Sequence, residues 1–361
     1  MTLDLFKKLD DVDENALHPK YKFLQDNSLL DGEREILTNW TEGFVDRDNK
    51  IIKEFQTTFH SSFWEFYLYK VFKEAGFNID FTYDRPDFMI ISPLEINIEA
   101  VVSNIKQGGV ADESRNLDNI LSMLEPPHLQ ENYREFLDEA IVRNSSAILS
   151  KSKKYLSNYS NCGWIKSETP FIIALSSYGQ IDYGREYYYP LLALLYGLYF
   201  NPSKKDFDVV TEIIKPNTTS PIPVGIFNDK SLEHISAIIF SCTTTLGKLT
   251  SLSISQSLST LQLNTVINIR QDYEAPIYKI QMVSPDNQEE LSDGLFIFHN
   301  PFAKNKISKD AFGTTNIFQV TFDDRNLVFE GENLPIVSRF NIPQMMFNNL
   351  IIHDINKKFN G

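Results

Sequence analysis

The feature that most constrains the fold of this chain is a helix pattern that leads directly into two short apolar runs. Between His60 and Gly76 the apolar residues recur at helical spacing, and Gly76 follows a lysine-bearing last turn, which is typical of a helix end. The apolar runs 88–91 and 96–102 come next, separated by Ser92, Pro93 and Leu94. The pattern predicts a mostly buried helix followed by a hairpin of two largely buried strands.

Each of these three elements carries one acid. Glu65 lies at the edge of the apolar face of the helix, Asp87 at the mouth of the first strand and Glu99 inside the second. Because side chains alternate faces along a strand, Glu99 shares a face with Asn97 and Val101, where a carboxylate is costly unless it is paired, hydrogen-bonded or bound to a metal. Three oxygen donors on adjacent elements suit Mg²⁺. The alternatives are a solvated flank position for Glu65 and a structural ion pair for Glu99.

This stretch resembles the PD-(D/E)XK phosphodiesterase superfamily, which includes many restriction endonucleases. The residues that carry the likeness are Glu65, Pro86 and Asp87 in RPDF, and Glu99 in IEA. The likeness covers roughly residues 55 to 105 and extends loosely to about residue 242. It implies a restriction-endonuclease-like core in which Glu65, Asp87 and Glu99 hold Mg²⁺ or Mn²⁺ for phosphodiester hydrolysis.

The chain departs from the family pattern at Val101, where the superfamily places a lysine two residues after the second acid. The segment from Glu135 to Tyr155 is a predicted helix on which Arg143, Lys151 and Lys154 share one side. If this helix packs beside the acids, Lys151 or Lys154 replaces the missing catalytic lysine, and Arg143 binds a phosphate of the substrate. A solvated basic face is the alternative. Lys106, in the glycine-containing segment after the second strand, is a weaker candidate.

The rest of the chain alternates strand and helix patterns. Strand-like runs occur at 170–177, 234–241 and 294–301, and an aromatic, leucine-rich segment with Pro190 near its first turn predicts a further helix. We therefore expect an α/β protein with a mixed central sheet flanked by helices. The predicted organisation is an N-terminal extension (1–50), a nuclease-like core (51–248) with an insertion near 105–133, and a β-rich C-terminal part of the core or subdomain (249–361).

Composition narrows the class of protein. No apolar run reaches the roughly 20 residues needed to span a bilayer, and the N-terminus lacks a signal-peptide pattern. Two cysteines are too few for a disulfide framework, so we expect a cytoplasmic protein without a membrane partner. The net charge of -14 argues against a protein that coats nucleic acid nonspecifically, but a local basic groove can exist on an acidic molecule.

Together these features predict a Mg²⁺- or Mn²⁺-dependent endonuclease-type hydrolase that cleaves DNA in preference to RNA. The resemblance places such an enzyme in restriction or another form of bacterial defence against phage, with a homodimer as one option for its assembly. The alternative is a catalytically inactive member of the same fold that serves as a binding or scaffolding subunit. The absent lysine and the acidic charge favour this alternative.

Overall fold

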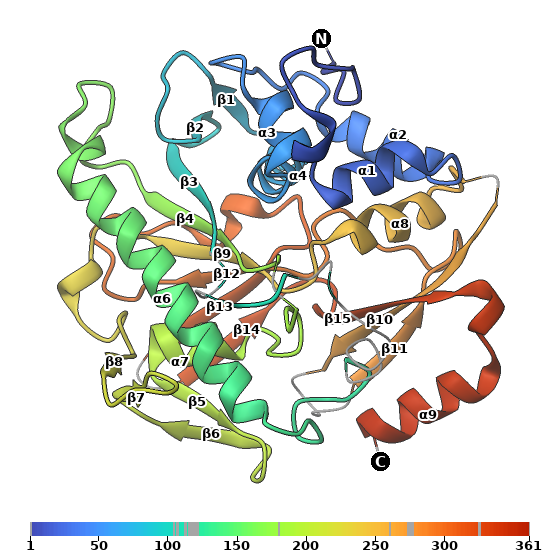
Figure 1. The fold of residues 1–361 in the computed structure, drawn as a ribbon. Coiled ribbons are helices and arrows are strands. Elements are labelled where there is room, and N and C mark those ends of the chain that lie inside the picture. The colour runs from blue at the N-terminus through green and yellow to red at the C-terminus, as the bar shows by residue number, and fades with distance from the viewer. Residues whose placement is uncertain are drawn as a thin grey trace.

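The computed structural model describes residues 2–103, 105, 108–111, 114, 123–179, 181–259, 261–272, 278–323 and 326–360. These residues form an α/β protein with a mixed eight-stranded central sheet, covering helices and small additional antiparallel sheets (Figure 1). The predicted fold class is confirmed at this level.

The central sheet contains both parallel and antiparallel pairs. β3 pairs in parallel with β4 and β4 with β9, and β12 pairs in parallel with β13, while the remaining neighbours are antiparallel. Its strands, in order across the sheet, are β1 (Asn78–Asp80), β2 (Phe88–Ser92), β3 (Ile96–Val102), β4 (Phe171–Ser176), β9 (Ala237–Ser241), β12 (Leu295–His299), β13 (Phe318–Asp323) and β14 (Asn326–Glu330).

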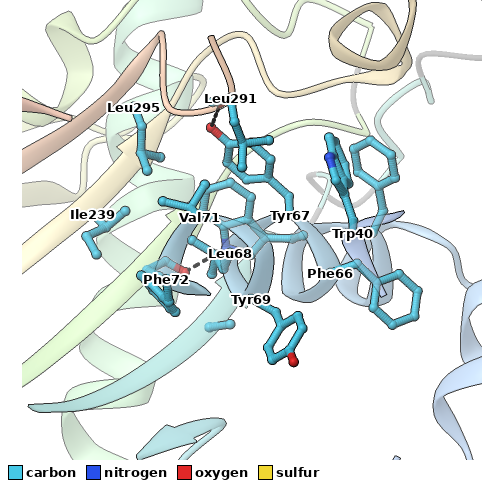
Figure 2. Packing of buried hydrophobic residues seen from close by; sticks show 14 of the residues in the cluster. Trp40, Phe66, Tyr67, Leu68, Tyr69, Val71, Phe72, Ile239, Leu291 and Leu295 are labelled. Atoms are coloured by element: carbon cyan, nitrogen blue, oxygen red, sulfur yellow. Dashed lines mark hydrogen bonds between the residues drawn. The ribbon is translucent and has the colours of Figure 1, made fainter. Parts of the chain in front are cut away.

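One face of the sheet packs against α4 (His60–Glu74) and the helices around it. Figure 2 shows this core, in which Tyr67, Val71 and Phe72 of α4 lie near Ile239 and Leu295 of the sheet. The hydroxyl of Tyr67 donates to the backbone oxygen of Leu291 at 2.9 Å. The other helices that contribute to this core are α1 (Pro19–Asp26), α2 (Asp31–Trp40), α3 (Ile51–Thr57) and α8 (Leu246–Ser255).

The opposite face packs against α6 (Tyr133–Ser157) and α7 (Tyr189–Tyr196), and α6 crosses the sheet as one long helix (Figure 1). Alternation along β3 divides its side chains as predicted. Ile98 and Ala100 belong to the α4 core, and Val101 packs against the α6 core.

Smaller elements surround the central sheet and its covering helices. A three-stranded sheet has the order β11 (Tyr278–Met282), β10 (Asn264–Gln271), β15 (Ile336–Pro343). The two-stranded hairpins are β5 (Leu198–Asn201) with β6 (Asp206–Val209), and β7 (Glu212–Ile214) with β8 (Pro221–Pro223). The described single-turn helices are η1 (Glu14–Ala16), η3 (Tyr159–Asn161), η4 (Lys230–Leu232), η5 (Lys309–Phe312) and η6 (Gln344–Met346), and α9 (Asn349–Asn360) lies near the C-terminus.

Both ends of the chain pack with the rest of the molecule. Leu5, Tyr21 and Trp40, from the predicted N-terminal extension, lie in the same core as α4. In the predicted β-rich C-terminal part, β12, β13 and β14 extend the central sheet, and most of α8 and all of α9 also lie there. The predicted insertion near 105–133, together with Lys106, falls largely outside the described residues. None of the described helices is long and apolar enough to cross a membrane.

Candidate active site

The candidate site lies where β2 stops and β3 continues. The pairing of β2 with β3 reaches Phe88 opposite Ile98, but β3 extends to Val102. Beyond that pair, the N–H of Ala100 donates to Oδ2 of Asp87 at 2.7 Å, so a side chain replaces the backbone acceptor of the missing strand. The edge of β3 that β2 leaves uncovered is therefore open to both α4 and α6, which flank it from opposite faces.

A pocket of about 600 Å³ occupies this notch. Four of the six candidate site residues line it: Glu65, Asp87, and Lys151 and Arg143 of α6. The other lining residues are Ser61, Trp64, Ala100, Val101, Val102, Ile105, Val142, Ser146, Ala147, Ser150 and Lys215. A larger pocket of about 980 Å³ between β15 and α9 contains none of the predicted site residues.

Helix α4 is fixed against the sheet next to Glu65. The indole Nε1 of Trp64 donates to the backbone oxygen of Ala174 in β4 at 3.0 Å, and Trp64 is fully buried. Because an anchored neighbour fixes the rotation of the helix about its axis, Glu65 is directed into the pocket. The alternative of a solvated flank residue does not hold for Glu65, which is only partly exposed.

Glu65 and Asp87 have raised pKa values. Burial raises the pKa of Glu65 well above its usual range, the charge of Asp87 raises it further, and the charge of Arg47 opposes both. Burial, and then the charge of Glu99, raises the pKa of Asp87 to about 6, while Lys151 opposes the shift. Burial and mutual repulsion thus outweigh the nearby positive charges for both carboxyl groups, and groups with such shifted pKa values often mark functional sites.

Glu99 is engaged by α6 and the segment that follows it. Its Oε1 accepts from Nζ of Lys151 at 2.7 Å, from Nζ of Lys154 at 3.3 Å and from the hydroxyl of Tyr159 at 2.9 Å. The prediction that Lys151 or Lys154 points toward the acids is confirmed, since both bind Glu99. The structural ion pair considered for Glu99 is therefore present. Its other oxygen, Oε2, is buried and has no hydrogen-bond partner.

The two lysines are not equivalent. The Lys151 side chain is 21% exposed and lines the pocket, whereas that of Lys154 is 47% exposed and lies above the ring of Tyr159. Lys151 therefore both binds Glu99 and lines the pocket. Lys154 supports Glu99 from the solvent side.

Arg143 is buried and loosely held. Its Nη1 donates to Oγ of Ser103 at 3.2 Å and to the backbone oxygen of Ser177 at 3.5 Å, and its Nε has no hydrogen-bond partner. Its acidic neighbours stay at 3.8 Å (Glu139) and 3.7 Å (Glu186). Burial raises the pKa of Glu186 to about 7, and Arg143 opposes that shift. A guanidinium with five N–H donors and so few close acceptors can still bind an anion in the pocket.

Sequence reasoning missed Arg47. This residue lies between α2 and α3, and its Nη1 donates to the backbone oxygens of Tyr83 at 2.7 Å and Pro86 at 3.2 Å. It therefore ties down the turn that leads into Asp87, and its charge acts on both Glu65 and Asp87. No sequence signal marks it, because an arginine that binds backbone carbonyls leaves no spacing pattern. Tyr159, the phenol bound to Glu99, was missed for the same reason.

The three acids do not form a ready metal cage. Within the described part of the chain, no group of three or more His, Cys, Asp or Glu side chains is arranged to hold a metal ion. The prediction that Glu65, Asp87 and Glu99 converge closely enough to share one cation is not met by these side-chain positions, because the ion pairs with α6 hold Oε1 of Glu99. Searches of protein-family models, curated proteins and solved structures find no match to the chain.

Proposed function

We propose that the chain is a divalent-metal-dependent phosphodiesterase with a restriction-endonuclease-like core, acting on nucleic acid, DNA in preference to RNA. The observation that carries the proposal is the shared pocket of Glu65, Asp87 and Lys151, with Lys151 bound to Glu99. An acid from helix α4, an acid from the turn just before β2 and a lysine that takes the place of the one missing at Val101 make up the chemical set of such an enzyme.

The donors present fit Mg²⁺ or Mn²⁺ without a third fixed carboxylate. Mg²⁺ commonly binds one or two carboxylates and completes its shell with water and substrate phosphate. Glu65 and Asp87 would supply two such ligands. Glu99, whose charge acts on Asp87, also has a buried oxygen, Oε2, without a hydrogen-bond partner. When bound, the metal would lower the pKa of a water molecule and neutralise charge on the phosphate.

The protein side chains have separate roles in this proposal. Asp87 and Glu65 hold the cation, and the bond from Ala100 fixes Asp87 against β3. Lys151, oriented by Glu99, directs the attacking water, and Arg143 binds a phosphate oxygen from the inner end of the pocket.

One observation favours the second candidate, an inactive nuclease-fold protein that serves as a binding subunit. The contacts from Lys151, Lys154 and Tyr159 give Glu99 a charge partner without any metal. In that case Glu65 and Asp87 remain unneutralised, and metal binding is weak or absent.

Metal binding separates the two candidates. The melting temperature of the metal-free protein should rise with added Mn²⁺ by mass action, equivalent to about 2.7 kcal/mol when the ion is at 100 times its Kd. Asp87→Asn and Glu65→Gln should lose this rise. Glu95→Gln, an exposed acid between β2 and β3 that pairs with Lys166 outside the pocket, should keep it. No rise in the wild type would favour the binding subunit.

The Asp87→Asn variant also tests how the stability of the protein depends on pH. The pKa of Asp87 in the folded state is about 6, above its usual 3.8. The contribution of this carboxyl group to the free energy of unfolding is therefore fully present below pH 3.8 and is lost as pH rises through 6. Asn at this position can still accept the Ala100 bond. Metal-free Asp87→Asn should therefore be more stable than wild type at pH 8, by about 1–3 kcal/mol, and should lose this advantage at pH 4. Equal melting temperatures of metal-free wild type and Asp87→Asn at pH 8 would contradict the raised pKa of Asp87.

A further inference from the structure

The pocket has a basic wall that does not come from α6. Lys215, which directly follows β7 in the β7–β8 hairpin, lines the same pocket as Glu65 and Asp87. Neither the resemblance nor the spacing of the sequence assigns this hairpin a role. It adds a third positive side chain, beside Arg143 and Lys151, to a pocket with two acids.

The hairpin holds Lys215 in a defined place. At its base Ile213 is buried in the core on the α6 face of the sheet. At its tip the N–H of Lys215 donates to the backbone oxygen of Ser220 at 2.9 Å, and the oxygen of Lys215 accepts from N and Oγ1 of Thr218 at 3.1 and 2.9 Å. The backbone of Lys215 is therefore fixed at the pocket rim, while its side chain is exposed.

Lys215 also differs from the other two cations in its partners. Lys151 is bound to Glu99, and Arg143 faces two acids. Among the described residues, Lys215 forms no ion pair, so its charge is available to a ligand. Among the described residues that line the pocket, Lys215 is therefore the cation without an acidic partner, and it lies at the exposed rim. A cation in such a position can bind a phosphate by charge.

We propose that Lys215 binds a phosphate adjacent to the one bound by Arg143 and by the cation that Glu65 and Asp87 would hold, so that the pocket recognises a nucleic-acid strand with consecutive phosphates rather than an isolated phosphodiester. This inference rests on the proposed function for the first phosphate. The contact itself is electrostatic and positions the strand without reading its bases.

The first experiment compares two substrates of the holoenzyme with Mn²⁺. Lys215→Ala should lower kcat/KM for a labelled oligonucleotide about 5- to 50-fold, mainly through KM, because removing a phosphate contact weakens binding before and during reaction. The loss should be at least fivefold smaller for bis(4-nitrophenyl) phosphate, which has a single phosphodiester. Lys153→Ala removes the same charge from an exposed position of α6 outside the pocket and should behave as wild type. Equal losses on both substrates would overturn the inference.

The second experiment does not need catalysis. In the Asp87→Asn background, Lys215→Ala should weaken oligonucleotide binding and reduce the slope of log K against log[salt] by about 0.7 to 0.9, whereas Lys153→Ala should not. If the wild type cleaves no substrate and Lys215→Ala still binds the oligonucleotide more weakly than Lys153→Ala does, the proposed nuclease activity is wrong and the phosphate contact is supported. If Lys215→Ala binds as Lys153→Ala does, or no oligonucleotide binds, the contact is refuted even if cleavage is observed.

Discussion

At the residue scale, burial and pairing give similar residue types different roles. Lys151 and Lys154 both contact Glu99, but Lys151 alone of the two also lines the pocket. Their spacing on one helix face was sufficient to predict that one of them reaches the acids. Spacing alone could not predict which of them faces the pocket, because that depends on how far α6 advances along β3.

This difference predicts unequal losses of activity. Lys151→Ala should reduce the single-turnover rate of cleavage at least about 100-fold, the typical size of a positioned proton-transfer group, while Lys154→Ala should reduce it less than about tenfold. Both variants should fold, since Glu99 retains one lysine and the hydroxyl of Tyr159 in each. A larger loss of rate in Lys154→Ala than in Lys151→Ala, or no loss in either variant, would rule out Lys151 as the replacement lysine.

At the scale of elements, some helices and strands around the site can be predicted from the sequence and others cannot. The helix at 60–76 and the following hairpin appear as α4, β2 and β3, and the basic helix appears as α6, because each has a strong apolar period. Helix α8 was not predicted because its Ser- and Thr-rich sequence hides its apolar face. The sequence does not predict the packing of the N-terminal segment, because its apolar residues are spread over several short elements that come together only in the folded core.

That segment reaches the site through Arg47. Arg47→Ala should free the turn before Asp87, weaken Mn²⁺ binding and lower kcat about tenfold, with a stability loss of about 1–2 kcal/mol. Arg34→Ala is a matched control, because Arg34 also donates to two backbone oxygens, but these belong to Leu24 and Asn27 and not to the turn before Asp87. Arg47→Lys should restore part of the metal affinity. Calorimetric titration with Mn²⁺ measures the difference, and equal affinities for both alanine variants would refute a role beyond folding.

At the scale of the whole molecule, the eight-stranded sheet places the acids at a break in its pattern. β2 is shorter than β3, so the end of β3 is open to helices from both faces, and this is why α4 and α6 can meet at one pocket. The sequence supports the class of fold, and four of the six predicted site residues line the pocket. It could not predict the strand order, the entry of the β7–β8 hairpin at the rim, or the engagement of Glu99 by α6, since these depend on contacts between residues far apart in the chain.

The central claim is that the pocket of Glu65, Asp87 and Lys151 hydrolyses phosphodiesters of nucleic acid with a divalent metal. The most direct measurement is cleavage of linear and circular DNA, single- and double-stranded, and of RNA, by purified wild type with Mg²⁺ or Mn²⁺ and by Asp87→Ala prepared in the same way. The account predicts cleavage by wild type that EDTA abolishes and that Asp87→Ala lacks, although the variant keeps a cooperative melting transition. Cleavage that persists in Asp87→Ala, or a folded wild type that cuts none of these substrates with either metal, would contradict it.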